Sequence, residues 1–162
     1  MQMEYRPATA EEMELVWDRL VAEHPDNPRW AEWRTEYIQN HLTGKSLPFL
    51  VLDGGVPIGE GTLLLSPECS AAAGRTALCD GAGTANVNAL RIRKDYEGQG
   101  HISRLVREME ACAVRRGIRR LTIGVEAKET RNLAIYLHWG YTRFLFSQVE
   151  DGELVLYFGK DL

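Results

Sequence analysis

Apolar residues recur along the chain in two rhythms, and these rhythms divide it into strands and helices. Alternating or continuous apolar runs predict seven strands, because strand side chains point in turn to opposite faces of a sheet. The strands cover residues 3–6, 49–52, 56–65, 84–93, 121–127, 144–150 and 154–159. Apolar residues spaced by three and four predict four helices, one ending before Pro25 and the others at residues 30–38, 99–116 and 129–141. The order βααβββαβαββ predicts an α/β fold with one mixed sheet.

Local signals mark the ends of several predicted elements. Thr9 can cap the first helix, because Glu12 follows three residues later as in a capping box. The turn signals at residues 53–55 (Asp-Gly-Gly) and 151–152 (Asp-Gly) predict two hairpins within the sheet. Gly117 predicts a left-handed residue at the end of the third long helix.

Residues 66–84 differ from the rest because they carry little periodic pattern. A loop of this length in a compact domain is usually either mobile or functional. Its charged members include Arg75 and Asp80. Two interpretations stay open, namely a segment that binds substrate and an insertion without a role in binding.

The composition fits one globular domain over residues 1–162 and excludes several classes of function. Apolar residues make up 44% and charged residues 26%, which is enough for a core and a polar surface. The formal net charge of −4 argues against nucleic acid as a partner. No apolar run approaches the ~20 residues of a membrane span, and no signal-peptide core opens the chain. The 3 cysteines lack metal-ligand spacing, so we expect reduced thiols, a cytoplasmic protein and no metal.

The segment from residue 90 to residue 107 has the pattern of an anion site. It begins as a strand, turns at Gly98 and Gly100, and continues as an amphipathic helix. Glycines let the backbone approach a ligand closely. The free N–H groups and the positive dipole end of a helix then favour a phosphate. The sequence therefore predicts a phosphate-binding turn at this strand-to-helix junction.

Two common phosphate-binding loops do not match this chain. A dinucleotide fingerprint would need a third glycine where Ser103 stands. The Gly-Lys-Ser string at residues 44–46 has no glycine loop before it, and Pro48 prevents a long helix from starting directly after it. Neither a dinucleotide site nor a Walker loop is therefore expected.

Two motifs together resemble the GCN5-related N-acetyltransferase (GNAT) superfamily. Leu90-Arg91-Ile92 takes the place of the family's Leu-x-Val strand, and residues 97–102 (Glu-Gly-Gln-Gly-His-Ile) take that of its coenzyme loop. Glu97 stands where the family usually has Arg or Gln, and Ile102 where it has Gly or Ala.

The second motif is the helix at residues 129–141. It is similar to the family helix Asn-x-x-Ala-x-x-Leu-Tyr-x-x-x-Gly-Phe. Tyr136 and Gly140 fall in register, whereas Glu129 replaces Asn and Asn132 replaces Ala. The two motifs have the family's order and separation, and the matched region covers about residues 85–146.

The resemblance implies a mostly antiparallel sheet flanked by helices, with a splay between the fourth and fifth strands where acetyl-CoA would bind. It implies that backbone N–H groups near Ile92 face the thioester oxygen. The residues that it implies for coenzyme binding are Leu90, Arg91, Ile92, Arg93, Gly98, Gln99, Gly100, His101, Ile102, Ser103, Glu129 and Asn132. The aromatic residues of the second helix, which include Trp30, are either packing residues or one wall of the acceptor pocket.

The resemblance also implies that the Tyr136 hydroxyl protonates the departing thiolate. The general base is less defined, because the family's glutamate position holds Asn86, and an amide accepts no proton. Glu126, at the end of the fifth strand, is the first candidate, and Glu60, Asp80 and water are alternatives. Glu60 lies between two glycines on its strand, and the favoured interpretation is a charge that faces solvent.

The predicted function is acetyl-CoA-dependent transfer of an acetyl group to a primary amine. The acceptor is a small-molecule or peptide amine that the sequence does not identify, and a homodimer is left open. One alternative is a weak or inactive acyl-CoA-binding or sensing module, which the departures at Asn86, Glu97, Ile102 and Glu129 keep open. Another is the transfer of a different acyl group.

Overall fold

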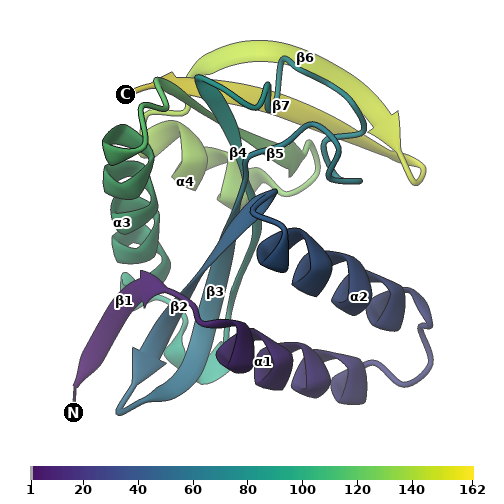
Figure 1. Ribbon diagram of the computed structural model, residues 1–162. Coiled ribbons are helices and arrows are strands. Elements are labelled where there is room, and N and C mark those ends of the chain that lie inside the picture. Colours follow the sequence, from purple (N-terminus) through teal and green to yellow (C-terminus); the bar gives the residue numbers. More distant parts are fainter. Residues whose placement is uncertain (1) are drawn as a thin grey trace. The chain divides into compact units, whose positions relative to one another are not determined.

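The computed structural model describes residues 2–162, and these form seven strands, four α-helices and one short 3₁₀ helix (Figure 1). The order is β1 (Met3–Pro7), α1 (Ala10–Glu23), α2 (Arg29–Leu42), β2 (Ser46–Asp53), β3 (Val56–Leu64), β4 (Thr84–Ile92), η1 (Lys94–Tyr96), α3 (His101–Arg115), β5 (Arg120–Glu126), α4 (Thr130–His138), β6 (Arg143–Glu150) and β7 (Glu153–Asp161). Apart from the short η1, this is the predicted order. The largest difference in length is at α2, which continues past the predicted end to Leu42.

Hydrogen bonds connect the strands in the order β1-β2-β3-β4-β5-β7-β6. The pairs β1–β2, β5–β7 and β6–β7 are antiparallel, whereas β4 and β5 are parallel. The parallel ladder ends at Val87↔Ile123, although β4 continues to Ile92 and β5 to Glu126. A mixed, mostly antiparallel sheet in which β4–β5 pairing stops early confirms the predicted fold class.

Contacts between Cα atoms group the chain into two compact units. The first holds the residues up to Thr62 together with Ala89–Glu108, and the second holds Leu63–Asn88 and Met109–Leu162. β4 contributes its first half to the second unit and its second half to the first. The assignment of one domain to residues 1–162 stays a prediction.

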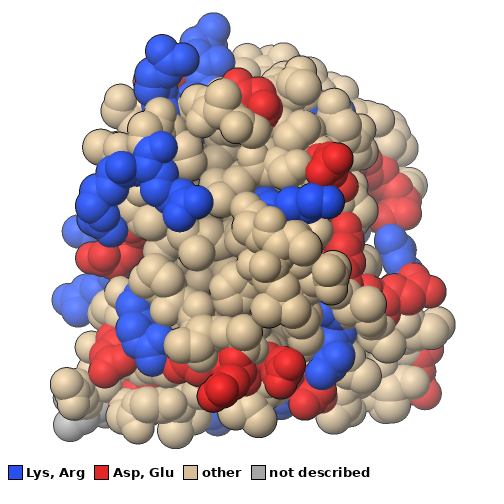
Figure 2. Space-filling view, viewed as in Figure 1, with Lys and Arg blue, Asp and Glu red and all other residues tan. Residues whose placement is uncertain are grey.

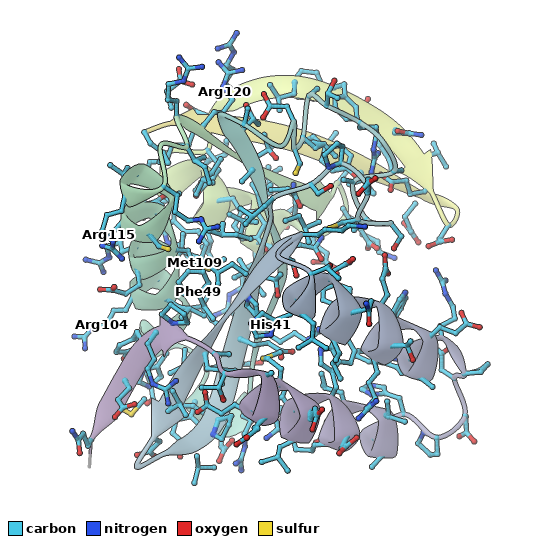
Figure 3. All side chains as sticks on the ribbon, in the orientation of Figure 1. His41, Phe49, Arg104, Met109, Arg115 and Arg120 are labelled. Carbon is cyan, nitrogen blue, oxygen red and sulfur yellow. The ribbon has the colours of Figure 1, made fainter. Side chains whose placement is uncertain are left out.

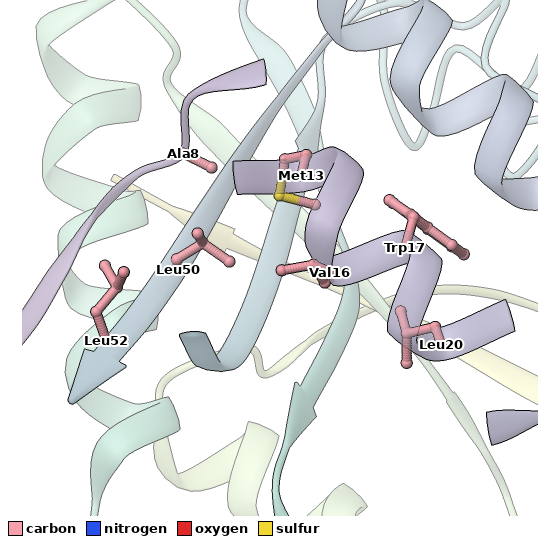
Figure 4. Close-up of a cluster of buried hydrophobic side chains, with 7 residues drawn as sticks. All are labelled: Ala8, Met13, Val16, Trp17, Leu20, Leu50 and Leu52. Atoms are coloured by element: carbon pink, nitrogen blue, oxygen red, sulfur yellow. The ribbon is translucent and has the colours of Figure 1, made fainter. Parts of the chain in front are cut away.

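In the first unit, Thr9 caps the start of α1 as predicted. The Thr9 hydroxyl accepts the Glu12 N–H at 3.2 Å, and the Glu12 carboxylate accepts the Thr9 N–H at 2.9 Å, which completes the capping box. The buried stripe of α1 packs with β2 residues in one cluster (Figure 4). The cluster consists of Ala8, Met13, Val16, Trp17, Leu20, Leu50 and Leu52, and Trp30, Trp33, Tyr37 and Ile38 of α2 pack against it.

The second unit contains the β6–β7 hairpin, which turns at Asp151 (φ +50°) and Gly152 (φ +79°) as predicted. Residues 65–83 form no helix or strand, yet four of them are buried in the core of this unit: Cys69, Ala72, Leu78 and Cys79. Arg75 ties this loop to β6, because its Nη1 lies 2.9 Å from Gln148 Oε1 and 3.3 Å from Glu150 Oε2. The loop is therefore packed as part of the unit.

α3 ends where its sequence predicted. Gly117 has a φ of +80°, and the Ile118 N–H donates to the Ala113 carbonyl at 2.9 Å, which closes the helix end. Over residues 2–162, no helix has both the length and the apolar character needed to cross a bilayer.

Candidate active site

The turn between β4 and α3 has the backbone geometry of an anion site. Gly98 and Gly100 have φ angles of +74° and +83°, and a Cβ at either position would meet nothing within 4 Å. The Gly100 carbonyl accepts the Arg104 N–H at 3.1 Å, which begins the α3 ladder. The N–H groups of residues 101–103 therefore have no acceptor within the helix. We call this turn, residues 98–103, the glycine cradle; its donors suit a phosphate.

His101, within the cradle, has protein partners on both ring nitrogens. The Tyr5 hydroxyl lies 2.8 Å from Nδ1, and Gln99 Oε1 lies 3.1 Å from Nε2. The ring of His101 also stacks on Tyr5 and meets the ring of Tyr96 edge-on, with centroids 6.1 and 6.0 Å apart. The predicted contact of His101 with the coenzyme is therefore expected through its backbone N–H, not through the imidazole.

Basic side chains accompany the cradle. Lys and Arg side chains gather over α3 (Figure 2), and Arg104 projects outward from that helix (Figure 3). Within the first turns of α3, Arg107 Nη2 lies 3.5 Å from the Ser103 hydroxyl oxygen. The carboxylate of Glu97 is exposed to water, which screens its repulsion of a phosphate. The local charge therefore favours an anion despite Glu97.

The backbone of β4 is irregular just before the segment that the resemblance assigns to the coenzyme. Ala89 has a φ of +56°, in the left-handed region that alanine rarely adopts. The Arg93 N–H, at the far end of the segment, donates to the Ile58 carbonyl of β3 at 2.8 Å. Such a distortion changes the direction in which the following N–H groups point. Nothing in the local sequence marks Ala89 for this role.

Glu60 of β3 is not the solvent-facing charge that the sequence favoured. Only 5% of the residue is exposed, and its Oε1 accepts the Nε–H of Arg91 at 2.5 Å. The guanidinium carbon of Arg91 lies 5.4 Å and 5.3 Å from the ring centroids of Trp17 and Trp30. That interpretation of Glu60 was wrong, because its partner lies 31 residues further along the chain and no local pattern shows it.

A pocket of about 300 Å³ opens in the first unit, against α1, the start of α2, β3 and the end of β4. Its walls combine apolar side chains with charged ones, and the charged residues are Arg19, Glu23, Glu60, Arg91 and Arg93. Trp30 also lines it, with its ring stacked on His24 at a centroid distance of 3.9 Å. Trp30 therefore both packs against the core and forms part of a pocket wall.

Tyr136 lies on α4 in the second unit and is partly buried. Its ring centroid is 5.5 Å from that of Trp139. Burial, and to a smaller extent the charge of Glu129, raises the pKa of the Tyr136 hydroxyl above its ordinary value of 10.0. Glu129, at the start of the same helix, accepts a hydrogen bond from the Asn132 amide at 2.7 Å. The phenol therefore keeps its proton at neutral pH.

The candidate bases of the second unit have different surroundings. Glu126 ends β5 with its side chain 37% exposed, and Lys128 Nζ lies 3.7 Å from its Oε2. Asp80 accepts the N–H groups of Thr84 and Ala82 at 3.0 and 2.9 Å, and the bond from Thr84 is the main cause of its lowered pKa. A carboxylate with a lowered pKa is a weaker base, so Asp80 is better explained as a turn residue.

Asn86 is a structural residue within the parallel ladder. It is 4% exposed, and its amide donates to the Thr122 hydroxyl at 3.0 Å. The Thr122 hydroxyl in turn donates to the Leu78 carbonyl at 2.7 Å, which fixes the end of the long loop. Asn86 therefore joins β4, β5 and the loop within the second unit.

The family model for the acetyltransferase (GNAT) family matches residues 10–141, which is most of the chain. The chain belongs to the GNAT acetyltransferase family. No curated protein sequence matches it.

Solved GNAT structures share the fold of this chain at low identity. A putative GNAT acetyltransferase from Desulfovibrio desulfuricans superposes with a TM-score of 0.74 at 13% identity, covering 99% of each chain. PaiA N-acetyltransferase from Thermoplasma acidophilum, solved with coenzyme A, gives 0.66 at 16% identity and covers 100% of both. A spermidine N-acetyltransferase chimera involving Vibrio cholerae gives 0.71 at 14% identity, covering 98% of this chain and 95% of that one. At these identities the likeness shows the fold alone.

The predicted site residues of this GNAT protein are divided between its two units. The cradle and the end of β4 lie together in the first unit, and Glu126, Glu129, Asn132 and Tyr136 lie in the second. Their roles toward a coenzyme stay predictions. Sequence reasoning missed the Glu60–Arg91 pair, which joins β3 to β4, and the left-handed Ala89.

Proposed function

We propose that this GNAT protein is an acetyl-CoA-dependent N-acetyltransferase that acts on a primary amine. The observation that supports this most directly is the glycine cradle, which has two left-handed glycines directly before the free N–H groups of α3. In a member of an acetyltransferase family, a phosphate site at this junction suits the pyrophosphate of coenzyme A.

The residues present fit such a coenzyme. Both glycine positions are open where a Cβ would stand, so a ligand can approach the backbone closely. The backbone of Leu90–Arg93, which lies beyond the end of the β4–β5 ladder, would pair with the amides of the pantetheine arm as an added strand does. Glu129 and Asn132 are further proposed contacts on α4. Bound acetyl-CoA would supply the activated acetyl group.

The proton roles go to two residues of the second unit. Tyr136 donates a proton to the departing thiolate. Its phenol, whose pKa is raised, carries that proton at neutral pH. Glu126 accepts the proton of the acceptor ammonium, and Lys128 Nζ lies 3.7 Å from its Oε2. The role of Tyr136 rests on the match to the family helix, and that of Glu126 on its place at the end of β5.

Two measurements test this proposal. Titration calorimetry with coenzyme A and acetyl-CoA measures binding, and thiol release from acetyl-CoA with a panel of primary amines measures turnover. We expect micromolar-range binding and amine-dependent thiol release. Binding without release for every amine would instead support the acyl-CoA-binding module, which the departures at Glu97 and Ile102 make the relevant alternative. Faster release from propionyl-CoA than from acetyl-CoA would point to another acyl group.

A further inference from the structure

The pocket of the first unit contains a guanidinium that is fixed in place. Glu60 holds Arg91 through the Nε–H, and the rings of Trp17 and Trp30 lie within 5.4 Å of its guanidinium carbon. The terminal nitrogens of Arg91 make no hydrogen bond to residues 2–162. When Nε is bonded, the terminal edge of a guanidinium stays available for two parallel bonds to a carboxylate. Arg91 is therefore prepared to bind an anionic group.

Glu60, in the same pocket, has a carboxylate oxygen that lacks a hydrogen-bond donor among residues 2–162. Its Oε2 is buried and has no hydrogen-bond partner in the part of the chain that the structure describes. A buried carboxylate oxygen without a donor is unfavourable, and such groups are rare in native structures. Because Glu60 lines the pocket, a ligand N–H group that enters it can supply the missing donor.

The pocket wall carries charges of both signs. Arg19 Nε lies 3.6 Å from Glu23 Oε1 and Arg91 pairs with Glu60, so two of the three guanidinium groups face a carboxylate of the same wall, and Arg93 is the third. A polyamine would meet guanidinium groups on two walls, and a polyanion would meet two carboxylates. A ligand that carries one charge of each sign satisfies both Arg91 and the free oxygen of Glu60.

The size and the lining of the pocket further restrict the class of ligand that it can bind. The volume of about 300 Å³ is at the small end for ligand pockets and suits a single small molecule. Apolar side chains also line the pocket, with Val16, Leu20 and Ile58 among them. We propose that this pocket is the acceptor site and that it binds a free apolar α-amino acid, with the carboxylate on Arg91 and the ammonium on Glu60. This inference rests on the proposed function, because it supplies the acceptor of that reaction.

The test compares three amino acids with their decarboxylated counterparts by titration calorimetry. The pairs are L-leucine with isoamylamine, L-methionine with 3-(methylthio)propylamine, and L-phenylalanine with phenethylamine. We expect at least one amino acid to bind at least about tenfold more tightly than its amine, because the amine lacks the carboxylate for Arg91. Leucinamide, which has the amide of a peptide N-terminal residue, and spermidine are further arms. Equal or tighter binding of the amines, leucinamide or spermidine would overturn the inference.

Variants test whether the Arg91–Glu60 pair causes the preference for the amino acid over its amine. Arg91→Met alone leaves Glu60 buried without a partner and can unfold the protein, so the double variant Arg91→Met/Glu60→Gln removes both charges together. We expect it to lose the preference for the amino acid, whereas Arg34→Met, which breaks only the surface pair with Asp18, keeps it. A double variant that retains the preference would refute the assignment. Thiol release is measured separately: no release with any amine counts against the proposed function, whereas release with other amines but not with the bound amino acid counts against this pocket as the acceptor site.

Discussion

The glycine cradle can be tested with a matched pair of substitutions, Gly100→Val and Gly44→Val. Both glycines have left-handed backbones, with φ of +83° and +76°, and a Cβ at either would meet nothing within 4 Å. Gly44 lies in the turn between α2 and β2, outside the cradle. The two substitutions therefore impose the same kind of strain on the fold, and only one of them alters the proposed coenzyme site.

The strain has a predictable magnitude. A β-branched residue in the left-handed region costs about 1–3 kcal/mol. The reduced freedom of the unfolded chain returns about 0.4–1 kcal/mol of this. We expect both variants to lose about 1–2 kcal/mol of unfolding free energy, which lowers Tm by roughly 2–8 °C for a protein of this size. Denaturant unfolding followed by circular dichroism measures this loss.

Coenzyme binding should separate the two variants. The branched side chain of Gly100→Val would hold a pyrophosphate away from the N–H groups of α3. Losing even one charge-assisted backbone bond lowers affinity by about tenfold to a hundredfold. Calorimetry with coenzyme A should show this loss in Gly100→Val and near-parent affinity in Gly44→Val. Parent affinity in folded Gly100→Val, or an equal loss in both variants, would refute the cradle as the pyrophosphate site.

Three further substitutions test separate parts of the molecule. Tyr136→Phe keeps the ring and removes the proton donor, so kcat should fall at least about tenfold with little change in acetyl-CoA affinity; unchanged turnover would make Tyr136 a packing residue. Glu97→Arg should tighten coenzyme A binding modestly, and weaker binding would show that Glu97 points elsewhere. A hydrogen bond from Arg6 lowers the pKa of Glu12 from 4.5 to about 2, so the unfolded chain binds more protons between these values and stability falls as pH drops through them. Glu12→Gln should lose less stability than the parent between pH 7 and pH 3 in urea unfolding, and an equal loss would contradict this origin.

Local chemistry made most of the fold predictable from the sequence. The capping box at Thr9 and the hairpin turn at Asp151 each act within a few residues, so their outcome depends little on the rest of the chain. The early end of the β4–β5 ladder was predictable only through the family resemblance. Elements bounded by such local signals appear in the structure where they were expected.

Contacts between residues far apart in the sequence explain what the sequence alone could not show. A Cβ on Gly59 would lie 2.7 Å from Ile92 Cδ1 and 3.1 Å from the Arg91 carbonyl, so this glycine lets β3 and β4 approach closely beside Glu60. Alternation along β3 alone cannot reveal that contact. The burial of Cys79 in the long loop has a similar cause, because its thiol donates to the Leu64 carbonyl at 3.0 Å. The close approach at Gly59 and the burial of Cys79 both depend on partners that no local pattern identifies.

The aromatic cluster around Arg91 gives the protein an optical signal of its own. Of its 4 tryptophans, Trp17, Trp30 and Trp33 lie within one cluster of the first unit, and Trp139 lies in the second. Trp30 lines the pocket, and the charge of Arg91 lies against two of the indole rings. Indole emission responds to nearby charge and to water, so a carboxylate that arrives at Arg91 should change the emission of this cluster. Acceptors could thus be screened without a label or a coupled assay.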